Sequence, residues 1–316
     1  CDWSSDVCSS DLEEITPYRS SYPNAWVNIA YGCNNFCSYC IVPYVRGRER
    51  SRLPENVVDE VKNLVNEGYK EITLLGQNVN SYGHDLKNGA SFSSLLDEIG
   101  KIDGKFRLRF MSNHPKDLTE DVIEAIKRNP HACHAIHLPV QSGSNRILSL
   151  MNRRYSVEKY LSQIDSIRKI IPDCAITTDI IVGFPTETEN DFLDTVNLVE
   201  KVKFDGAFTF VYSKREGTKA AVMDGQIDPE IQKDRIMRLI DVQNDLNRKE
   251  SLTYVGKTVE ILVEDFDEKK NSYLGRDERG KMAYFSYDKN LIGKFVNVKI
   301  TSAGGMSLMG EITEIL

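Results

Sequence analysis

The chain has 316 residues, a formal net charge of −7 and 28% charged residues. This length suffices for one large domain and a small second one, and the negative charge excludes bulk electrostatic attraction to nucleic acid, so that any RNA site must be a local basic patch. The sequence has no apolar run of about eighteen residues and does not start with a basic segment followed by an apolar one. We therefore expect a soluble, cytoplasmic protein without a membrane partner.

The first residues, CDWSSDVCSSDL, share no periodicity with the rest of the chain. Because their end resembles an in-frame translation of a common sequencing adapter, we interpret residues 1–12 as an artefact and exclude Cys1 and Cys8 from metal-site counting. We interpret residues 13–21 as the remnant of a linker and expect the true start of the protein upstream of Glu13.

Three cysteines follow within one short loop. Cys33, Cys37 and Cys40 are separated by three and then two residues, with Gly32 before the first and Tyr39 before the third. A structural zinc site would show a fourth Cys or His at partner spacing, and the sequence offers none. Three thiolates can instead hold three irons of a 4Fe-4S cluster and leave the fourth iron open to a small molecule. An open iron indicates reaction, not only electron transfer.

Strand-like apolar runs then alternate with helical periods. Strands are predicted at 25–30, 72–75, 107–111, 135–138, 175–182 and 207–210, and helices at 55–67, 92–99, 119–128, 157–170, 192–202 and 229–251. Repeated strand–helix units predict an α/β domain with a parallel sheet, ending at about residue 253. Cys133 and Cys174 have no partner at ligand spacing and are expected to be small buried hydrophobes.

The pattern changes in the last part of the chain. Short strands are predicted at 259–263, 273–275, 281–285, 295–300 and 308–312, separated by Gly, Asp, Asn and Lys turns. A small closed antiparallel β-barrel is the economical architecture. Because its charges nearly cancel, RNA affinity would require a basic face such as Lys294, Lys299, Arg276 and Arg279. A role in stability alone explains this segment equally well.

Candidate ligand-binding residues lie at the ends of three of the predicted strands. In chain order they are Gly76, Gln77, Asn78, Gln141, Ser142, Asp179, Ile181 and Gly183. Groups at the carboxyl ends of parallel strands meet at one edge of the sheet and favour a ligand site there. A turn rich in Asn and Gly is the alternative explanation of the first segment. His114 and His137 lack a ligand-spaced partner and are expected to have packing or surface roles.

Four arginines alternate directly after the cysteine loop, at Arg46, Arg48, Arg50 and Arg52. In an extended strand they would share one face. A solvated charge run is one explanation. Their position beside the mouth of the expected site favours phosphate contact, either to RNA or to a neighbouring domain.

The cysteine spacing, with an aromatic residue before the third cysteine, resembles the signature of the radical S-adenosylmethionine (SAM) enzymes. The resemblance implies a partial (β/α) barrel in which Cys33, Cys37 and Cys40 hold the 4Fe-4S cluster and SAM binds its open iron. The cofactors carry the chemistry there, and the protein positions them and excludes water. Tyr39 would lie against the SAM adenine.

Two further resemblances concern the end of the fifth strand and the last segment. Ile181 and Gly183 are similar to the adenine-contacting Ile-x-Gly of the superfamily, although Glu187 comes one place later than in the commoner spacing, which leaves its role open. Residues 254–316 resemble a TRAM domain, an OB-like RNA-binding module, after a radical SAM domain at residues 22–253.

Longer segments narrow the resemblance to the methylthiotransferases. They are Val-Pro-Tyr with Arg-Gly after the cysteines, Leu-Gly-Gln-Asn-Val-Asn-Ser-Tyr-Gly from Leu75, His-Leu-Pro-Val-Gln-Ser-Gly-Ser from His137 and Asp-Ile-Ile-Val-Gly-Phe-Pro from Asp179. Residues 77–80 are closest to the members that modify the prenylated adenosine next to the tRNA anticodon. Relatives acting on threonylcarbamoyl-adenosine or on a ribosomal-protein aspartate usually differ there.

The resemblance implies that a methylthio group replaces the hydrogen on carbon 2 of N(6)-dimethylallyladenosine. This unactivated aromatic C–H has no useful acidity, so a radical is required. One SAM would supply the methyl group and another the radical, a donor of flavodoxin or ferredoxin type would supply the electron, and the purine would be splayed out of the anticodon loop. We expect a monomer. The alternatives are a methylthiotransferase for the other two substrates and a non-enzymatic RNA-binding protein with a structural metal.

Members of this family also carry an amino-terminal domain in which three further cysteines hold a second 4Fe-4S cluster, where the sulfur is delivered. The sequence shows no such domain, and we therefore expect the chain to bind and cleave SAM without completing sulfur insertion.

Overall fold

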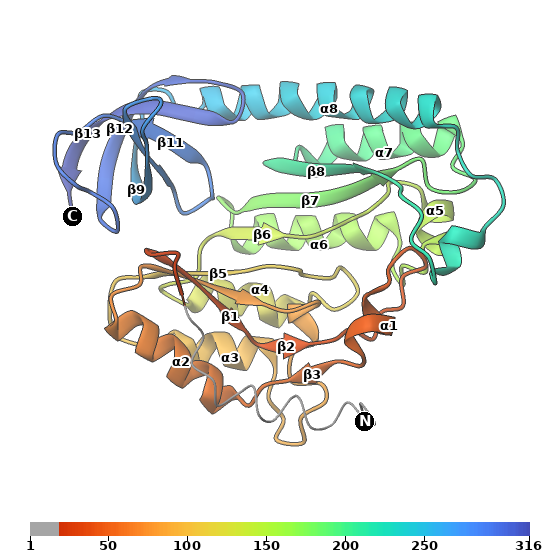
Figure 1. Ribbon diagram of the computed structural model, residues 1–316, viewed down its shortest axis with the longest axis horizontal. Coiled ribbons are helices and arrows are strands. Elements are labelled where there is room, and N and C mark those ends of the chain that lie inside the picture. The colour runs from red at the N-terminus through yellow and green to blue at the C-terminus, as the bar shows by residue number, and fades with distance from the viewer. Residues whose placement is uncertain (1–18) are drawn as a thin grey trace.

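The computed structural model describes residues 19–316, so that the expectations for residues 1–12 and for most of the linker lie outside the described residues. Six parallel strands form the larger domain (Figure 1). They are β1 (Asn24–Asn28), β4 (Glu71–Leu75), β5 (Arg107–Phe110), β6 (Ala135–His137), β7 (Ala175–Val182) and β8 (Gly206–Val211). They make two three-stranded sheets, β1-β4-β5 and β6-β7-β8. A single parallel bridge between Leu108 and Ala132 connects the two sheets, and the result is the expected partial barrel.

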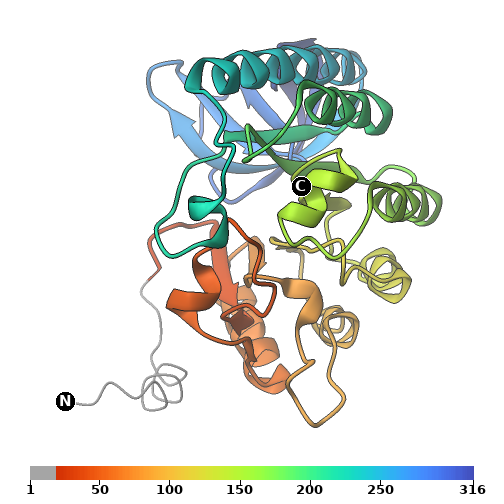
Figure 2. The ribbon, with the colours of Figure 1, turned by 90° about the vertical axis from the view of Figure 1, so that its right-hand side faces the viewer.

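Five helices follow the strands along one side of this barrel (Figure 2). They are α2 (Pro54–Asn66), α3 (Phe92–Ile99), α4 (Glu120–Arg128), α6 (Val157–Ile170) and α7 (Glu189–Val202). On β7, Ile176, Thr178, Ile180 and Val182 are buried, and the residues between them are partly exposed. Since side chains alternate across a strand, one face of the sheet packs against the helices and the other lines the barrel interior.

Short elements that the sequence pattern did not predict surround the carboxyl ends of the strands. They are β2 (Ala30–Tyr31), β3 (Arg50–Ser51), α1 (Val42–Arg46), α5 (Asn145–Leu150) and the 3₁₀ turns η1 (Val79–Ser81) and η2 (Lys219–Val222). Residues 46–52 are therefore not one extended strand, and the condition under which the four arginines would share one face is not met. Arg46 ends a helix, and Gly47 turns the chain with φ of +72° before β3 begins.

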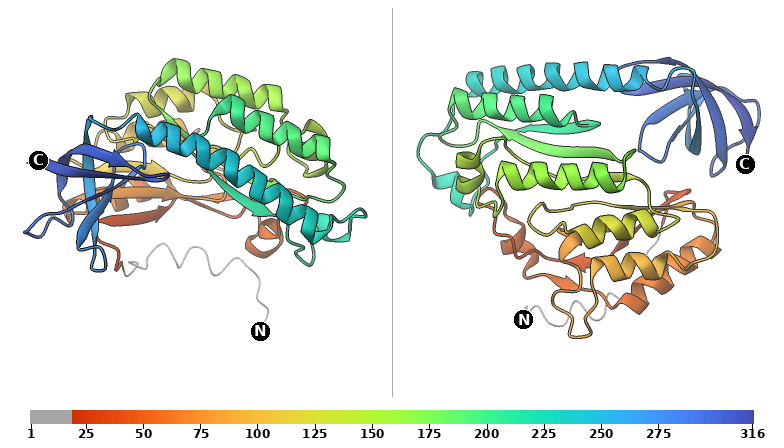
Figure 3. Two further views of the ribbon diagram at one scale, coloured as in Figure 1. Left: turned by 90° about the horizontal axis from the view of Figure 1, so that it is seen from above. Right: turned by 180° about the vertical axis from the view of Figure 1, so that it is seen from behind.

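Helix α8 (Pro229–Leu252) runs from the loop end of the barrel to the second domain (Figures 1 and 3). Near its start, the Gln232 side chain donates to the Gly183 carbonyl at 3.0 Å. At its far end, the Ser251 hydroxyl donates to the Gly305 carbonyl at 3.1 Å. Within residues 19–316 we find no helix with the length and apolarity needed to span a membrane.

The second domain is a closed five-stranded barrel in the order β10-β11-β13-β12-β9. Its strands are β9 (Thr258–Asp267), β10 (Ser272–Arg276), β11 (Met282–Phe285), β12 (Phe295–Ala303) and β13 (Ser307–Ile315). One detail differs from the expected antiparallel barrel, because β11 and β13 pair in parallel. β11 and β13 are not adjacent in sequence, and their parallel pairing helps to close the barrel.

Buried charges join the two domains. The Glu71 carboxylate is 1% exposed and accepts from Arg109 Nε and from Arg276 Nη2, each at 2.8 Å. On the same side, Arg107 donates to the Glu260 carbonyl at 3.0 Å, and Arg279 pairs with Asp205 at 2.6 Å. Arg276 and Arg279 are therefore interdomain contacts, and the expectation that they form part of an RNA-binding face is wrong.

We predict that Glu71→Gln destabilises the folded chain by about 3 kcal/mol, because it leaves the largely buried Arg109 without its carboxylate partner and removes one of the two carboxylates that pair with Arg276, which keeps Glu264. Glu98→Gln is the matched control, since its ion pair with Lys101 is exposed and should contribute no more than about 1 kcal/mol. Chemical denaturation of the two variants measures both values. Equal stability of the two variants would show that the domain junction does not depend on Glu71.

Candidate active site

The cysteine loop lies between β2 and α1, at the carboxyl ends of the barrel strands. Gly32 has φ of +72°, and a Cβ placed there would lie 2.1 Å from the Arg48 carbonyl oxygen. The Cys33 amide donates to the Gly47 carbonyl at 3.2 Å, and the Cys40 amide donates to the Cys37 carbonyl at 2.9 Å. Glycine is therefore required at position 32, because both the backbone conformation and the close approach exclude a side chain.

A segment from the other half of the barrel braces this loop. The Ser38 amide donates to the Met151 carbonyl at 3.0 Å, and its hydroxyl donates to the Leu150 carbonyl at 2.8 Å. The Asn152 side chain donates to the Phe36 carbonyl at 2.8 Å. The residues that follow α5 thus satisfy backbone groups of a loop that has little regular structure of its own.

The three thiols are free and partly exposed. Burial raises the pKa of Cys33 and of Cys40, and the neighbouring Cys37 raises both further. In residues 19–316, no three His, Cys, Asp or Glu side chains converge into a ready site for a single metal ion. One zinc ion would draw its thiolates together at about 2.3 Å from the metal, whereas a cubane cluster binds each thiolate through a different iron. Three thiols match the three irons that a 4Fe-4S cluster would present to them, whereas a structural zinc requires a fourth protein ligand.

Arg153 reaches the same loop from the segment after α5. Its Nη1 donates to the Cys37 sulfur at 3.4 Å, its Nε donates to the Tyr155 hydroxyl at 2.8 Å and its Nη2 donates to the Pro139 carbonyl at 3.1 Å. Burial alone would lower the pKa of Arg153, but Tyr155, Tyr39 and Cys37 shift it above its ordinary value. Sequence reasoning missed this residue, since one arginine between two helices carries no spacing signal.

Tyr39 and Ile181, both expected at the SAM adenine, contact one apolar cluster that contains Met151, Phe184 and Tyr212. Each of the two side chains is partly exposed at the edge of this cluster. Two residues that lie more than a hundred positions apart in the chain therefore pack against the same apolar cluster.

The Gly183 turn is fixed by a buried ion pair. The Gly183 amide donates to Glu187 Oε2 at 2.8 Å, and Arg235 of α8 donates to the same oxygen at 2.9 Å. Burial raises the pKa of Glu187, which is 3% exposed. Glu187, whose role the sequence left open, therefore supports the turn from within the protein.

Gln141, four residues beyond β6, lies beside Asp179 in the middle of β7. The backbone N–H of Gln141 donates to the backbone carbonyl of Asp179 at 2.8 Å. Gln141 has φ of +70°, which is uncommon for a residue other than glycine. His137 Nε2 lies 3.4 Å from Asp179 Oδ1. Ser142 is fully buried, and its hydroxyl accepts from the Ser144 amide at 3.2 Å, so that this hydroxyl is committed to the turn.

The segment after β4 is tied to the loop after β5. Asn78 is buried and donates to Asp117 at 2.7 Å, whereas Gln77 is partly exposed and Gly76 is buried. Within the described residues, Asn78 Oδ1 is buried without a hydrogen-bond partner. Part of this amide-rich segment therefore holds two neighbouring loops together.

The histidine in the neighbouring loop has a packing role, as expected. Burial, with a smaller contribution from Arg153, lowers the pKa of His114 to about 2. The His114 ring lies edge-on to Tyr155, with 5.8 Å between the ring centroids.

The predicted basic positions divide into two groups. Arg46, Arg48 and Arg50 are exposed beside the cysteine loop, and Lys294 and Lys299 are exposed on the small barrel, where Lys299 lies opposite Glu311. Arg52 is different, because it is buried and donates to Glu60 and to the Asn28 carbonyl. Arg52 stabilises the barrel and is not part of an exposed basic face.

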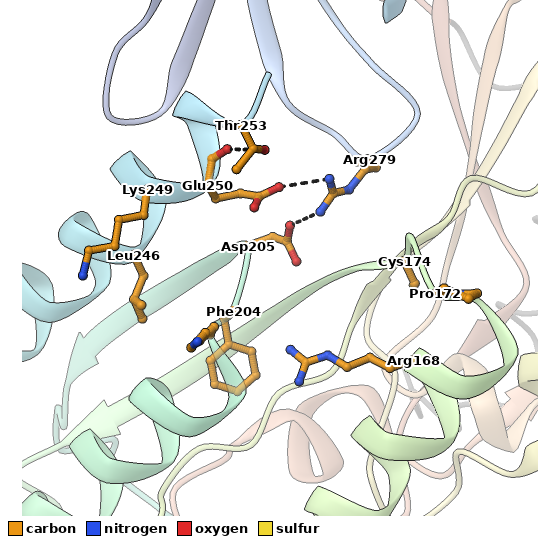
Figure 4. A pocket seen from close by; sticks show the side chains of 11 residues that line it. Arg168, Pro172, Cys174, Phe204, Asp205, Leu246, Lys249, Glu250, Thr253 and Arg279 are labelled. Carbon is orange, nitrogen blue, oxygen red and sulfur yellow. Dashed lines mark hydrogen bonds and ion pairs between the residues drawn. The ribbon is translucent and has the colours of Figure 1, made fainter. Parts of the chain in front are cut away.

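A separate cavity of about 400 Å³ lies at the opposite end of β7 and β8, next to the small barrel (Figure 4). Its lining includes Arg168, Phe204 and Arg279, and Arg279 pairs there with Asp205 and with Glu250. Because the cysteine loop lies at the carboxyl ends of the strands, this cavity does not belong to the candidate active site.

Comparison with known proteins agrees with this architecture. Residues 27–199 match the model of the radical SAM superfamily, and residues 252–313 match the TRAM domain. The solved structure of coproporphyrinogen III oxidase from Escherichia coli, a radical SAM enzyme, aligns with a TM-score of 0.55 at 16% identity, covering 89% of this chain and 68% of its own. The methyltransferase TsrM from Kitasatospora setae, solved with cobalamin and a [4Fe-4S] cluster, gives a TM-score of 0.54 at 18% identity, covering 63% and 38%. These two likenesses concern the fold alone.

The fold, the cysteine loop and the family models define a radical SAM domain followed by a TRAM domain. Two relatives are each named tRNA-2-methylthio-N(6)-dimethylallyladenosine synthase. The one from Thermoanaerobacter pseudethanolicus is 52% identical over 306 residues, and the one from Clostridium botulinum strain Okra is 54% identical over 303 residues. The matches cover 96% of this chain and 65% and 67% of the relatives, so that the chain spans about two thirds of their length. The chain belongs to this family within the radical SAM superfamily.

We predict that Gly32→Ala prevents the cysteine loop from closing, so that the chain loses most of the iron it takes up when reconstituted with iron and sulfide. Gly47→Ala is the matched control, because Gly47 has the same φ of +72° but has nothing within 4 Å of the position that an alanine Cβ would take. The control should cost about 1 kcal/mol in stability and retain its iron. Equal iron content in the two variants would contradict the role given to the close approach at Gly32.

Proposed function

We propose that the chain contributes the SAM-cleaving part of an enzyme that uses SAM and a 4Fe-4S cluster to methylthiolate carbon 2 of N(6)-dimethylallyladenosine next to the anticodon of tRNA. The observation that carries this proposal is the three-cysteine loop, braced at the carboxyl ends of the strands in a chain that is 52–54% identical to relatives of that name. The radical SAM match also argues against a non-enzymatic protein with a structural metal.

In this proposal Cys33, Cys37 and Cys40 would hold the cluster, which would supply the single electron for the cleavage of SAM into methionine and a 5′-deoxyadenosyl radical. Tyr39 and Ile181, which pack against the same apolar cluster, bind the SAM adenine beside the Gly183 turn. Gly76, Gln77, Asn78, Gln141 and Asp179 bind polar atoms of the ligands, and the buried Ser142 acts through its turn.

The RNA contacts of this proposal come from two places. Arg46, Arg48 and Arg50 are exposed beside the cysteine loop and contact phosphates of the anticodon loop. Lys294 and Lys299 provide weaker contacts on the TRAM domain, since Glu311 lies opposite Lys299. Because the net charge is −7, RNA binding depends on these local groups.

Several properties of the whole protein belong to the proposal and rest on the family resemblance. They are a second 4Fe-4S cluster in the relatives' further domain, an electron donor of flavodoxin or ferredoxin type, a monomeric state and a cytoplasmic location. The proposed boundary between the radical SAM and TRAM domains, at residues 253 and 254, agrees with the junction between α8 and the small barrel.

We predict that Cys37→Ala abolishes formation of 5′-deoxyadenosine from SAM when the anaerobically reconstituted chain is reduced with dithionite. Cys174→Ala is the control, because Cys174 is buried away from the loop and its thiol is inert. Chromatography of the quenched reactions measures the product. Cleavage of SAM by Cys37→Ala, or zinc in place of iron in the wild-type chain, would overturn the proposed function.

We predict that Arg48→Gln weakens binding of an anticodon stem–loop RNA and reduces the dependence of log K on log salt by about 1, because one phosphate contact is lost. Arg128→Gln should leave the slope unchanged, since Arg128 lies on the outer helix α4 and pairs with Asp97. Fluorescence anisotropy at several salt concentrations measures both slopes. An unchanged slope for Arg48→Gln would remove these arginines from the RNA contact.

A further inference from the structure

Arg153 is a cation fixed against a cluster ligand. It is 9% exposed, and its Nη1 lies 3.4 Å from the sulfur of Cys37. An arginine does not lose its proton in a protein. A permanent positive charge therefore lies beside one of the three thiols that would bind iron.

The guanidinium group is held in this position on its other sides. Its Nε donates to the Tyr155 hydroxyl and its Nη2 donates to the Pro139 carbonyl, and its carbon lies 5.1 Å from the centroid of the Tyr155 ring. The Tyr155 hydroxyl donates in turn to the Val140 carbonyl at 2.8 Å. Because Nε and Nη2 are bound to fixed acceptors, the guanidinium group of Arg153 is held next to the Cys37 sulfur.

We propose that Arg153 is a positioning residue that acts through Cys37 to raise the reduction potential of the cluster, an inference that rests on the cluster of the proposed function. Reduction adds one electron from an external low-potential donor, and the cluster becomes more negative by one charge. A buried cation and an N–H···S hydrogen bond to a ligand sulfur both stabilise the more negative state. Arg153 therefore makes the reduced cluster easier to reach before SAM binds.

The competing role for such a guanidinium group is to bind the carboxylate of SAM, which Arg side chains recognise well. The two roles make different predictions. Tuning through Cys37 changes the potential of the cluster in the absence of SAM, whereas a carboxylate ligand changes the affinity for SAM and leaves that potential as it was.

The test is a potentiometric titration, without SAM, of the anaerobically reconstituted chain, with the reduced cluster followed by electron paramagnetic resonance. The variants are Arg153→Gln, Arg153→Lys, Tyr155→Phe and, as control, Arg154→Gln, whose side chain is adjacent in sequence but exposed. For Arg153→Gln we expect the ratio of reduced to oxidised cluster to fall about tenfold at a fixed potential, a shift of about 59 mV to more negative values for one electron. Arg153→Lys should recover part of the shift, Tyr155→Phe should give a smaller shift of the same sign, and Arg154→Gln should give none.

An unchanged midpoint in Arg153→Gln would overturn the inference, and a loss of SAM affinity with an unchanged midpoint would assign the group to the SAM carboxylate. If Arg153→Gln binds no iron, then unchanged midpoints in both Arg153→Lys and Tyr155→Phe overturn it. A wild-type chain that binds no four-iron cluster would instead contradict the proposed function itself.

Discussion

The site depends on one constraint, which is that a cysteine loop with little regular structure must be held in its conformation by the rest of the barrel. Its backbone groups are satisfied by Gly47 on one side and by the residues after α5 on the other. The brace crosses the barrel, because the loop follows β2 and α5 follows β6. Both sheets must therefore be assembled before the three thiols are placed. The same segment delivers Arg153, and so the residues that shape the loop also set the charge around it.

Ion pairs also connect the two domains at their junction. Glu71 begins a central strand and is almost inaccessible, yet it holds Arg109 of its own domain and Arg276 of the TRAM domain. Buried carboxylates persist only when their charge is compensated. The basic residues of the small barrel are thereby divided between those that attach it to the larger domain and those, such as Lys294, that remain exposed to solvent.

The regular elements were predictable from the sequence, because apolar periods specify which face of a strand or helix is buried. The helices at 92–99 and 157–170 have the predicted bounds. The short elements α1 and α5 were not predictable, since five or six residues carry no periodicity. Arg52 shows a second limit, because alternation in sequence predicts a common face only in extended backbone, and Gly47 breaks that extension. The spacing of the cysteines predicts the cluster ligands, but the contact from Arg153 arises only when distant segments meet.

Helix α8 sets the distance between the Gly183 turn and the TRAM domain. Its 24 residues span about 36 Å, and its two ends are bound to the Gly183 turn and to the TRAM domain. A helix fixed at both ends acts as a rigid spacer, so the TRAM domain is held at a set distance from the Gly183 turn. If the proposed function holds, a single nucleoside would be too short to reach both places, whereas a folded RNA arm of several base pairs could bridge them. The spacing would then add the length of the RNA to the features by which the substrate is recognised.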